Sequence, residues 1–162
     1  MTGLLPFLQE FYAARLSMVL AHQASARLVG QYDANNTYQY IINREEAHLS
    51  WIASAIAELG GTATAGGEPP ARGGPGRGAD AAHAAIQEDA ALAQEFVDRW
   101  SPRVDALANA RHRVMLRVIL GETMEHKRFF EQALAGRNDL LGRRGEEVGP
   151  RVGQVLPTRW IE

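Results

Sequence analysis

Hydrophobic residues recur every three or four positions through most of the first 134 residues, which is the spacing of amphipathic helices. Four such stretches stand out, at about residues 4–30, 37–59, 79–100 and 102–134. No stretch shows the strict alternation of a half-buried strand. The pattern therefore predicts an all-α protein, and four long helices of this kind are typical of a four-helix bundle.

Residues that favour helix ends divide these stretches. Asn36 is a suitable N-cap for the second helix, and Gly60 with Gly61 is a strong signal for its end. Ser101 followed by Pro102 has the composition of an N-cap and first helical position. These signals predict that the fourth helix begins at that serine and proline.

Glycine and proline make up eleven of the nineteen residues in segment 60–78, so this segment is neither helix nor strand. Fully extended, it reaches about 60 Å, which exceeds the length of a bundle. We therefore expect two helical hairpins joined by a long crossover within one domain, residues 1–136. Residues 137–162, rich in Gly, Arg and Pro, are expected to form an irregular C-terminal tail.

Composition removes several classes of function. The chain has a formal net charge of −2 and no long basic run, which argues against a nucleic-acid partner. It has no cysteine, so disulfides, zinc–thiolate sites and cysteine nucleophiles are excluded. The N-terminus has no signal-peptide pattern, and no apolar run is long enough to cross a membrane. A cytoplasmic protein is expected.

Two helical stretches place a glutamate and a histidine on an apolar face. Glu45 and His48 continue the stripe of the second helix, and Glu122 and His126 continue that of the fourth. A carboxylate that faces a core is costly unless it is paired or bound to a cation. Two such pairs suggest that the partner is a metal ion.

The stretch "REEAHLSWIASAIAELGG", with Glu45 and His48 in Glu-x-x-His spacing, resembles the second helix of the ferritin-like superfamily, in its rubrerythrin and bacterioferritin branch. The resemblance covers residues 4–135. It implies a four-helix bundle with a long crossover between the second and third helices. It also implies a carboxylate-bridged metal centre, with one Glu from each of the first and third helices and a Glu-x-x-His motif from each of the others.

The chain departs from that pattern in three helices. In the fourth, Thr123 stands where the motif has Glu, so Glu122 is the expected ligand and Glu125 its competitor. The first and third helices have no Glu at the right level and offer histidine or glutamine instead; a shifted turn would bring Asp89 into the site. The expected metal ligands are Glu45, His48, Glu122, His126, His83, His22 and Gln23.

The resemblance implies an oxidoreductase that uses oxygen or peroxide, with one or two ions of iron, or of manganese or zinc. One alternative is a thiol-transferase-like bundle in which His48, His83 and His126 hold a single divalent ion. The other is a non-catalytic bundle that has lost its metal, with Glu45 and Glu122 paired to Arg27, Arg117 or the histidines. A homodimer through exposed helix faces or the tail is also expected.

Overall fold

The computed structural model describes residues 3–64 and 69–137 of the chain. It contains four helices, α1 (Leu4–Ala26), α2 (Tyr32–Glu58), α3 (Ala79–Asp105) and α4 (Ala110–Leu134), and these described ranges contain no strand. The predicted all-α four-helix bundle is confirmed. The predicted irregular tail lies, beyond Arg137, outside the described residues.

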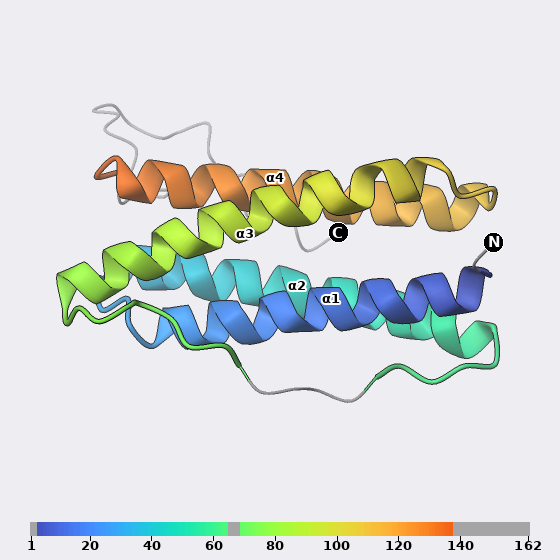
Figure 1. Cartoon of the computed structure of the whole chain (residues 1–162), viewed down its shortest axis with the longest axis horizontal. Helices are drawn as coiled ribbons and strands as arrows, with labels where there is room; N and C mark the ends of the chain where they lie inside the picture. The colour runs from blue at the N-terminus through green and yellow to red at the C-terminus, as the bar shows by residue number, and fades with distance from the viewer. Residues whose placement is uncertain (1–2, 65–68, 138–162) are drawn as a thin grey trace, which may run out of the picture.

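The helices form two antiparallel hairpins, α1 with α2 and α3 with α4, which pack against each other along their lengths (Figure 1). Helix α2 ends and α3 begins at opposite ends of the bundle, so the crossover between them leaves α2 and α3 running in the same direction. Gln9 Nε2 of α1 donates a hydrogen bond to the backbone oxygen of Thr62 at the start of this crossover, at 3.1 Å. In the part of the chain that the structure describes, no helix is apolar enough over a sufficient length to cross a membrane.

The turn between α1 and α2 lies earlier than predicted. The N-cap of α2 is Gln31, whose side-chain oxygen accepts a hydrogen bond from Ala34 N at 2.6 Å, so the prediction of Asn36 as N-cap is wrong. The neighbouring Asn35 stabilises the turn, because its Nδ2 donates to the carbonyl oxygens of Ala26 (2.9 Å) and Val29 (3.0 Å). The first contact satisfies a carbonyl group at the end of α1, and the second satisfies one in the turn itself.

The turn between α3 and α4 lies later than predicted. Helix α3 continues through Pro102 to Asp105, so the prediction that Ser101 and Pro102 begin the fourth helix is wrong. Trp100 and Val104 are both fully buried one helical turn apart, and their burial favours continuation over the missing amide of the proline. Asn109 caps α4 by accepting a hydrogen bond from His112 N at 3.0 Å. Compared with the prediction, this later turn changes which residues of α3 lie opposite which residues of α4.

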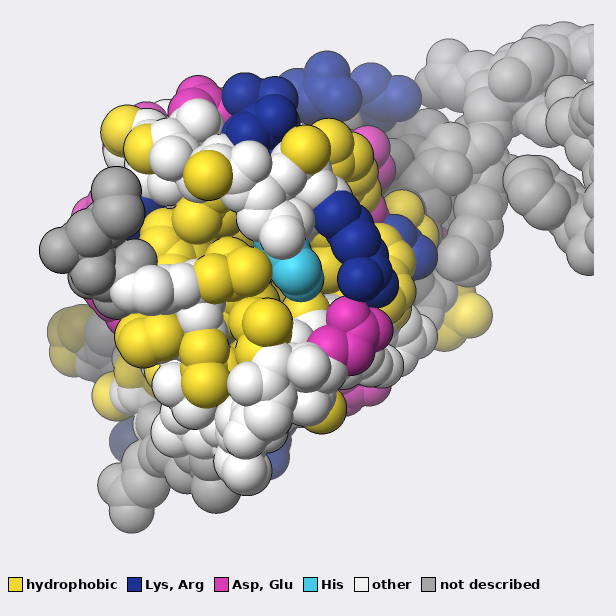
Figure 2. Space-filling view, turned by 90° about the vertical axis from the view of Figure 1, so that its right-hand side faces the viewer, with side chains coloured by type: hydrophobic (Ala, Val, Ile, Leu, Met, Phe, Trp, Pro, Cys, Tyr) yellow, Lys and Arg dark blue, Asp and Glu magenta, His cyan; other side chains and the backbone are white. Residues whose placement is uncertain are grey.

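The interior has an apolar cluster toward each end of the bundle, separated by buried polar side chains. We call the cluster around Phe7, Phe11, Phe96 and Trp100 the aromatic end. Its rings meet edge to face, with centroids 5.5 Å apart for Phe7–Trp100 and 4.9 Å for Phe11–Trp100. In the view of the bundle end at which α1 begins, hydrophobic side chains occupy the middle of the face and charged ones lie beside them (Figure 2). The second cluster contains Tyr38, Ile41, Ile42, Ile86 and Phe130.

Candidate functional site

Between the two apolar clusters, all four helices contribute polar side chains that are at most 1% exposed. Such complete burial of charged groups is rare unless they are paired, so this is the part of the molecule where chemistry is expected. We call seven of them the polar layer: Arg15 and His22 of α1, Glu45 and His48 of α2, Asp89 of α3, and Thr123 and His126 of α4.

Arg15 lies at the centre of the polar layer. Its Nη1 donates a hydrogen bond to Thr123 Oγ1 at 2.8 Å, and its Nη2 lies 3.0 Å from His48 Nδ1. The same Nη2 is 3.6 Å from Glu45 Oε2. One guanidinium, which keeps its charge in proteins, thus contacts residues of two other helices.

Glu45 is held from a second side by His22, whose Nδ1 lies 2.5 Å from Glu45 Oε1. Burial by itself raises the pKa of Glu45, but the charges of His22 and Arg15 overcome this effect and lower the pKa. Burial likewise lowers the pKa of His22, yet the nearby Glu45 and Asp89 raise it above the ordinary histidine value. Both shifts favour an ion pair of imidazolium and carboxylate at this contact.

His48 connects Arg15 with Glu122. Because Arg15 donates to its Nδ1, the proton of a neutral His48 belongs on Nε2, which lies 3.2 Å from Glu122 Oε2. Burial and then Arg15 lower the pKa of His48 to about 4, so the ring is neutral. Glu122 accepts two hydrogen bonds from Arg44, at 2.7 and 2.9 Å, and this contact lowers its pKa to about 2.

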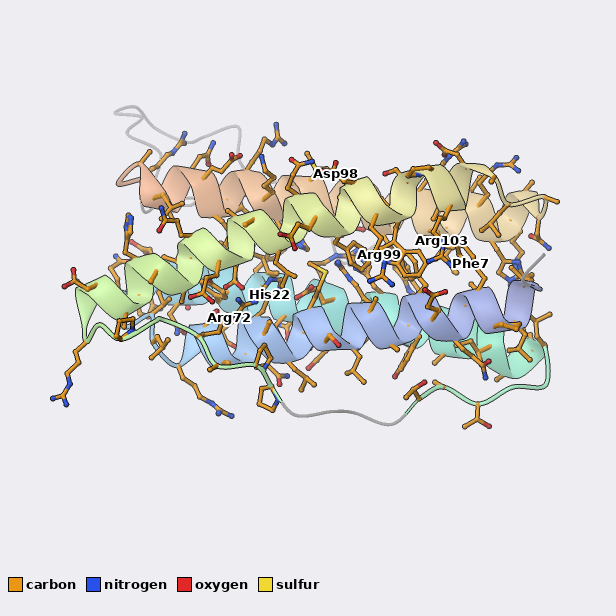
Figure 3. The ribbon with its side chains drawn as sticks, viewed as in Figure 1. Phe7, His22, Arg72, Asp98, Arg99 and Arg103 are labelled. Atoms are coloured by element: carbon orange, nitrogen blue, oxygen red, sulfur yellow. The ribbon has the colours of Figure 1, made fainter. Side chains whose placement is uncertain are left out.

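Asp89 joins the third helix and the crossover to the polar layer. It accepts a hydrogen bond from the Tyr38 hydroxyl at 2.6 Å, and its other oxygen lies 3.2 Å from Arg72 Nη2 and 3.9 Å from His22 Nε2. Arg72, in the crossover, also pairs with Glu88 at 2.8 Å. Figure 3 shows Arg72 and His22 at the same level of the bundle. The crossover is therefore anchored to the interior by ion pairs.

His126 is the one ring of the polar layer with neither nitrogen hydrogen-bonded among the described residues. Burial lowers its pKa to about 3, while the negative charge of Glu45 acts in the opposite direction. Its ring lies between aromatic neighbours, 6.4 Å from both Tyr40 and Phe129. A buried imidazole without partners costs about 1–3 kcal/mol, so His126 is the unsatisfied member of the polar layer.

Most, but not all, of the predicted site residues meet here. Glu45, His48, His22 and His126 are buried together, and Glu122 lies at the edge with its side chain 22% exposed. Gln23 is only half-buried and lines a surface hollow beside Arg27, whereas His83 is exposed near the start of α3. The expectation that His83 faces the interior is wrong, because the later turn before α4 places Asp89 there instead. Arg15 was not predicted at all, although it lies on the Phe11–Met18–His22 spacing.

The residues present do not fit a carboxylate-bridged pair of metal ions. The four carboxylates of this region, Glu45, Glu88, Asp89 and Glu122, already face four cations, Arg15, His22, Arg44 and Arg72. Thr123 receives Arg15 at the position where the motif has a glutamate. Within residues 3–64 and 69–137, no three or more His, Asp or Glu side chains are arranged to hold a metal ion.

Comparison with known proteins adds a likeness of fold. No family model and no curated protein matches the chain. Among solved structures, it is similar to a conserved hypothetical protein, Rv2844, from Mycobacterium tuberculosis, with a TM-score of 0.68 and 13% sequence identity. The match covers 78% of this chain and 93% of that one. At this identity the likeness concerns the fold alone.

Proposed function

We propose that the protein is a non-catalytic four-helix bundle, built like a ferritin-like protein, whose own side chains neutralise its buried carboxylates. The observation that carries this proposal is the position of Arg15, within 3.6 Å of Glu45 and in contact with His48 and Thr123. The arginines that pair with the two glutamates are Arg15, next to Glu45, and Arg44, next to Glu122. The two arginines that the sequence suggested for this role lie elsewhere: Arg27 is exposed, and Arg117 pairs with Asp105 at 2.9 Å.

Electrostatic repulsion supports the proposal. A cation that bound Glu45 would stand close to the Arg15 guanidinium, which is itself fully buried. Two like unit charges 4 Å apart repel by about 4 kcal/mol at the effective dielectric constant of a protein, and a divalent ion doubles that value. A metal ion therefore has to displace Arg15, which would then lose its contacts to Thr123 and His48.

Metal content tests the proposal directly. Protein purified without a histidine tag is analysed for transition metals, and its thermal melting is followed with and without a chelator. We expect far less than one metal ion per chain and the same melting temperature in both conditions. One or more ions per chain, together with a lower melting temperature after chelation, would overturn the proposal.

A second candidate function is the binding of a single divalent ion, and His126 is the observation that favours it. Both of its ring nitrogens lie buried without partners among the described residues. The ring also interacts electrostatically with Glu45, whose charge raises the pKa of His126. Imidazole together with carboxylate suits iron, manganese or zinc. This candidate agrees with the family resemblance in binding a metal ion, but differs from it in having no carboxylate that bridges two ions.

The two candidates predict different responses to added metal. If His126 is a ligand, Mn(II) or Zn(II) raises the melting temperature of the wild type but not that of His126→Leu. His83→Leu is the matched control, because it removes an exposed histidine and leaves the polar layer intact. If Arg15 instead excludes the ion, the metals leave the wild type unchanged, and Arg15→Leu is the variant that gains affinity for them.

A further inference from the structure

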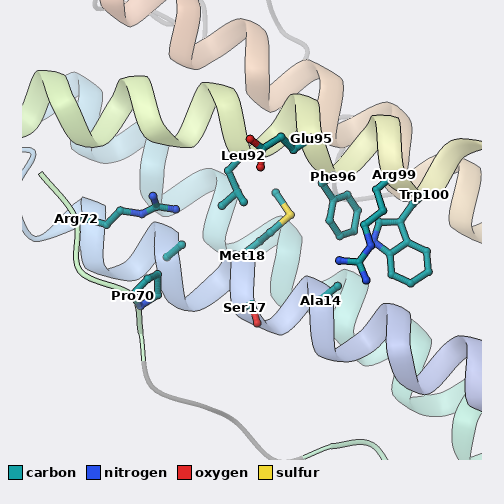
Figure 4. Close-up of a pocket in the computed structure, with 11 residues that line it drawn as sticks. Ala14, Ser17, Met18, Pro70, Arg72, Leu92, Glu95, Phe96, Arg99 and Trp100 are labelled. Carbon is teal, nitrogen blue, oxygen red and sulfur yellow. The ribbon is translucent and has the colours of Figure 1, made fainter. Parts of the chain in front are cut away.

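A cavity of about 450 Å³ lies between α1 and α3, next to the crossover. Its volume is in the range of small-molecule sites in proteins. Met18 of α1 and Leu92, Phe96 and Trp100 of α3 supply much of its apolar lining, and Arg72 and Arg99 lie toward its two ends (Figure 4). No residue of the polar layer is among its described lining residues. The lining nevertheless adjoins that layer, because Met18 and Phe96 contact Arg15 and Arg72 pairs with Asp89.

The side chains around this cavity have more hydrogen-bond donors than acceptors. Trp100 is fully buried, and its indole N–H has no acceptor among the described residues. The Nε–H of Arg72 is likewise buried without an acceptor in that part of the chain. Protein atoms cover both of these donors. What the cavity presents to a ligand is its apolar lining, with the guanidinium groups of Arg72 and Arg99 toward its ends, and this combination suits an anionic group on an apolar body.

Arg99 is the arginine of the lining that has hydrogen-bond donors available for a ligand. Glu10 accepts two hydrogen bonds from Arg103, at 2.9 and 2.7 Å, whereas Arg99 reaches the same carboxylate only once, at 3.3 Å. The guanidinium of Arg99 lies over the Trp100 ring, 5.1 Å from its centroid, so these two side chains lie at the same end of the cavity. At the other end, Arg72 already pairs with Glu88 and Asp89.

We propose that this cavity binds an aliphatic monocarboxylate of medium chain length. The hydrocarbon chain lies against Met18, Leu92 and Phe96, and the carboxylate accepts hydrogen bonds from Arg99. Arginine suits this role because its planar donors match the geometry of a carboxylate. Glu95, which is exposed at the rim, is the one acidic side chain among the described lining residues, and it weakens binding by repulsion.

Calorimetric titration of the wild-type chain with sodium decanoate tests this assignment, with decanol as a neutral ligand of the same length. We expect saturable binding of decanoate, and weaker binding of decanol. Arg99→Gln is expected to weaken decanoate about tenfold, which corresponds to one charge-assisted hydrogen bond, and to leave decanol unchanged. Glu95→Gln is expected to tighten decanoate only.

Two further variants separate the cavity from non-specific binding. Met18→Trp fills the space and is expected to abolish binding; Leu92→Trp serves the same purpose from the other helix if the first variant fails to fold. Arg111→Gln is the control, because Arg111 is an exposed arginine paired with Glu58, away from the cavity. No saturable binding of decanoate, equal binding of decanoate and decanol, or equal affinity of Arg99→Gln and Arg111→Gln would each overturn the assignment.

Discussion

Phe11 and Arg15 lie one turn apart on α1 and are both fully buried, but the regions around them are stabilised differently. Phe11 belongs to the aromatic end, where rings pack on Phe96 and Trp100 with little directional demand. Arg15 belongs to the polar layer, where each charge requires a partner at a defined place. Loss of volume weakens the first region, whereas loss of one partner leaves an unpaired charge in the second.

The polar layer also connects elements that the aromatic end does not. Arg15 links α1 to α2 and α4, and Asp89 links α3 to α2 and, through Arg72, to the crossover. Buried ion pairs add little net stability compared with apolar packing, because desolvation offsets their attraction. Their benefit is positional, since a shift of one helix along another breaks several of these contacts at once. We infer that the polar layer fixes the register of the four helices.

The sharpest test of this contrast is Arg15→Met, which keeps the volume of the side chain and removes its charge. We expect a loss of about 3–5 kcal/mol in the free energy of unfolding by urea, because Glu45 keeps only His22 as a partner. Arg117→Met is the control, since it breaks an exposed pair with Asp105 and is expected to change stability by about 0.5 kcal/mol or less. Equal losses in both variants would show that Arg15 does not neutralise Glu45.

A double variant tests whether the loss comes from the unpaired charge. Arg15→Met combined with Glu45→Gln removes both charges, while the glutamine oxygen still accepts a hydrogen bond from His22. We expect the double variant to be more stable than the sum of the single losses predicts, by about 0.5–3 kcal/mol. Arg15→Met combined with Arg117→Gln provides the additive reference. Additivity in both combinations would contradict a direct interaction.

The sequence was sufficient to predict the four helices, the two hairpins and the crossover, because apolar periodicity and the Gly/Pro-rich segment report these features locally. It was also sufficient to predict that the side chains of Glu45, His48 and His126 face the interior. It did not reveal Arg15, because a periodicity analysis counts an arginine as a break in an apolar stripe, and only its contacts from α2 and α4 explain its burial. Asp89 was missed as a principal residue because the turn before α4 depends on the burial of Val104, a tertiary effect that overrides the signal of Pro102.

Acid should affect the two regions differently. Burial lowers the pKa of His48 to about 4 and of His126 to about 3, so below pH 6.5 the unfolded chain takes up protons that the folded chain excludes. The unfolding free energy should fall by up to about 1.4 kcal/mol per pH unit for each of these rings between pH 6.5 and 4. Glu122, whose pKa is lowered to about 2, extends the loss below pH 4.5. His22 acts oppositely, because its raised pKa contributes stability at low pH that is lost as the pH rises.

Urea unfolding across this pH range measures the effect. His126→Met removes one of the two excluded protons, so the dependence of stability on pH between 6.5 and 4 should become shallower. Ile119→Val, in the apolar cluster of the aromatic end, should lower stability by about 0.5–1.5 kcal/mol at every pH without changing the slope. An unchanged slope in His126→Met would mean that His126 is accessible to protons in the folded state.

The smallest expected effect comes from the solvent-facing edge of the polar layer, where Arg44 and Glu122 are 36% and 22% exposed. Arg44→Gln should cost about 0.2–1 kcal/mol, although its contacts to Glu122 are as short as those of Arg15 to the interior. Salt separates the two arginines further. Raising the ionic strength to about 1 M shortens the screening length to about 3 Å, so the loss in Arg44→Gln should diminish, whereas the loss in Arg15→Met should persist because solvent ions do not reach it. If salt reduces the losses in Arg44→Gln and Arg15→Met equally, solvent ions reach the polar layer. The polar layer and the aromatic end would then differ in their residues but not in how well they exclude solvent.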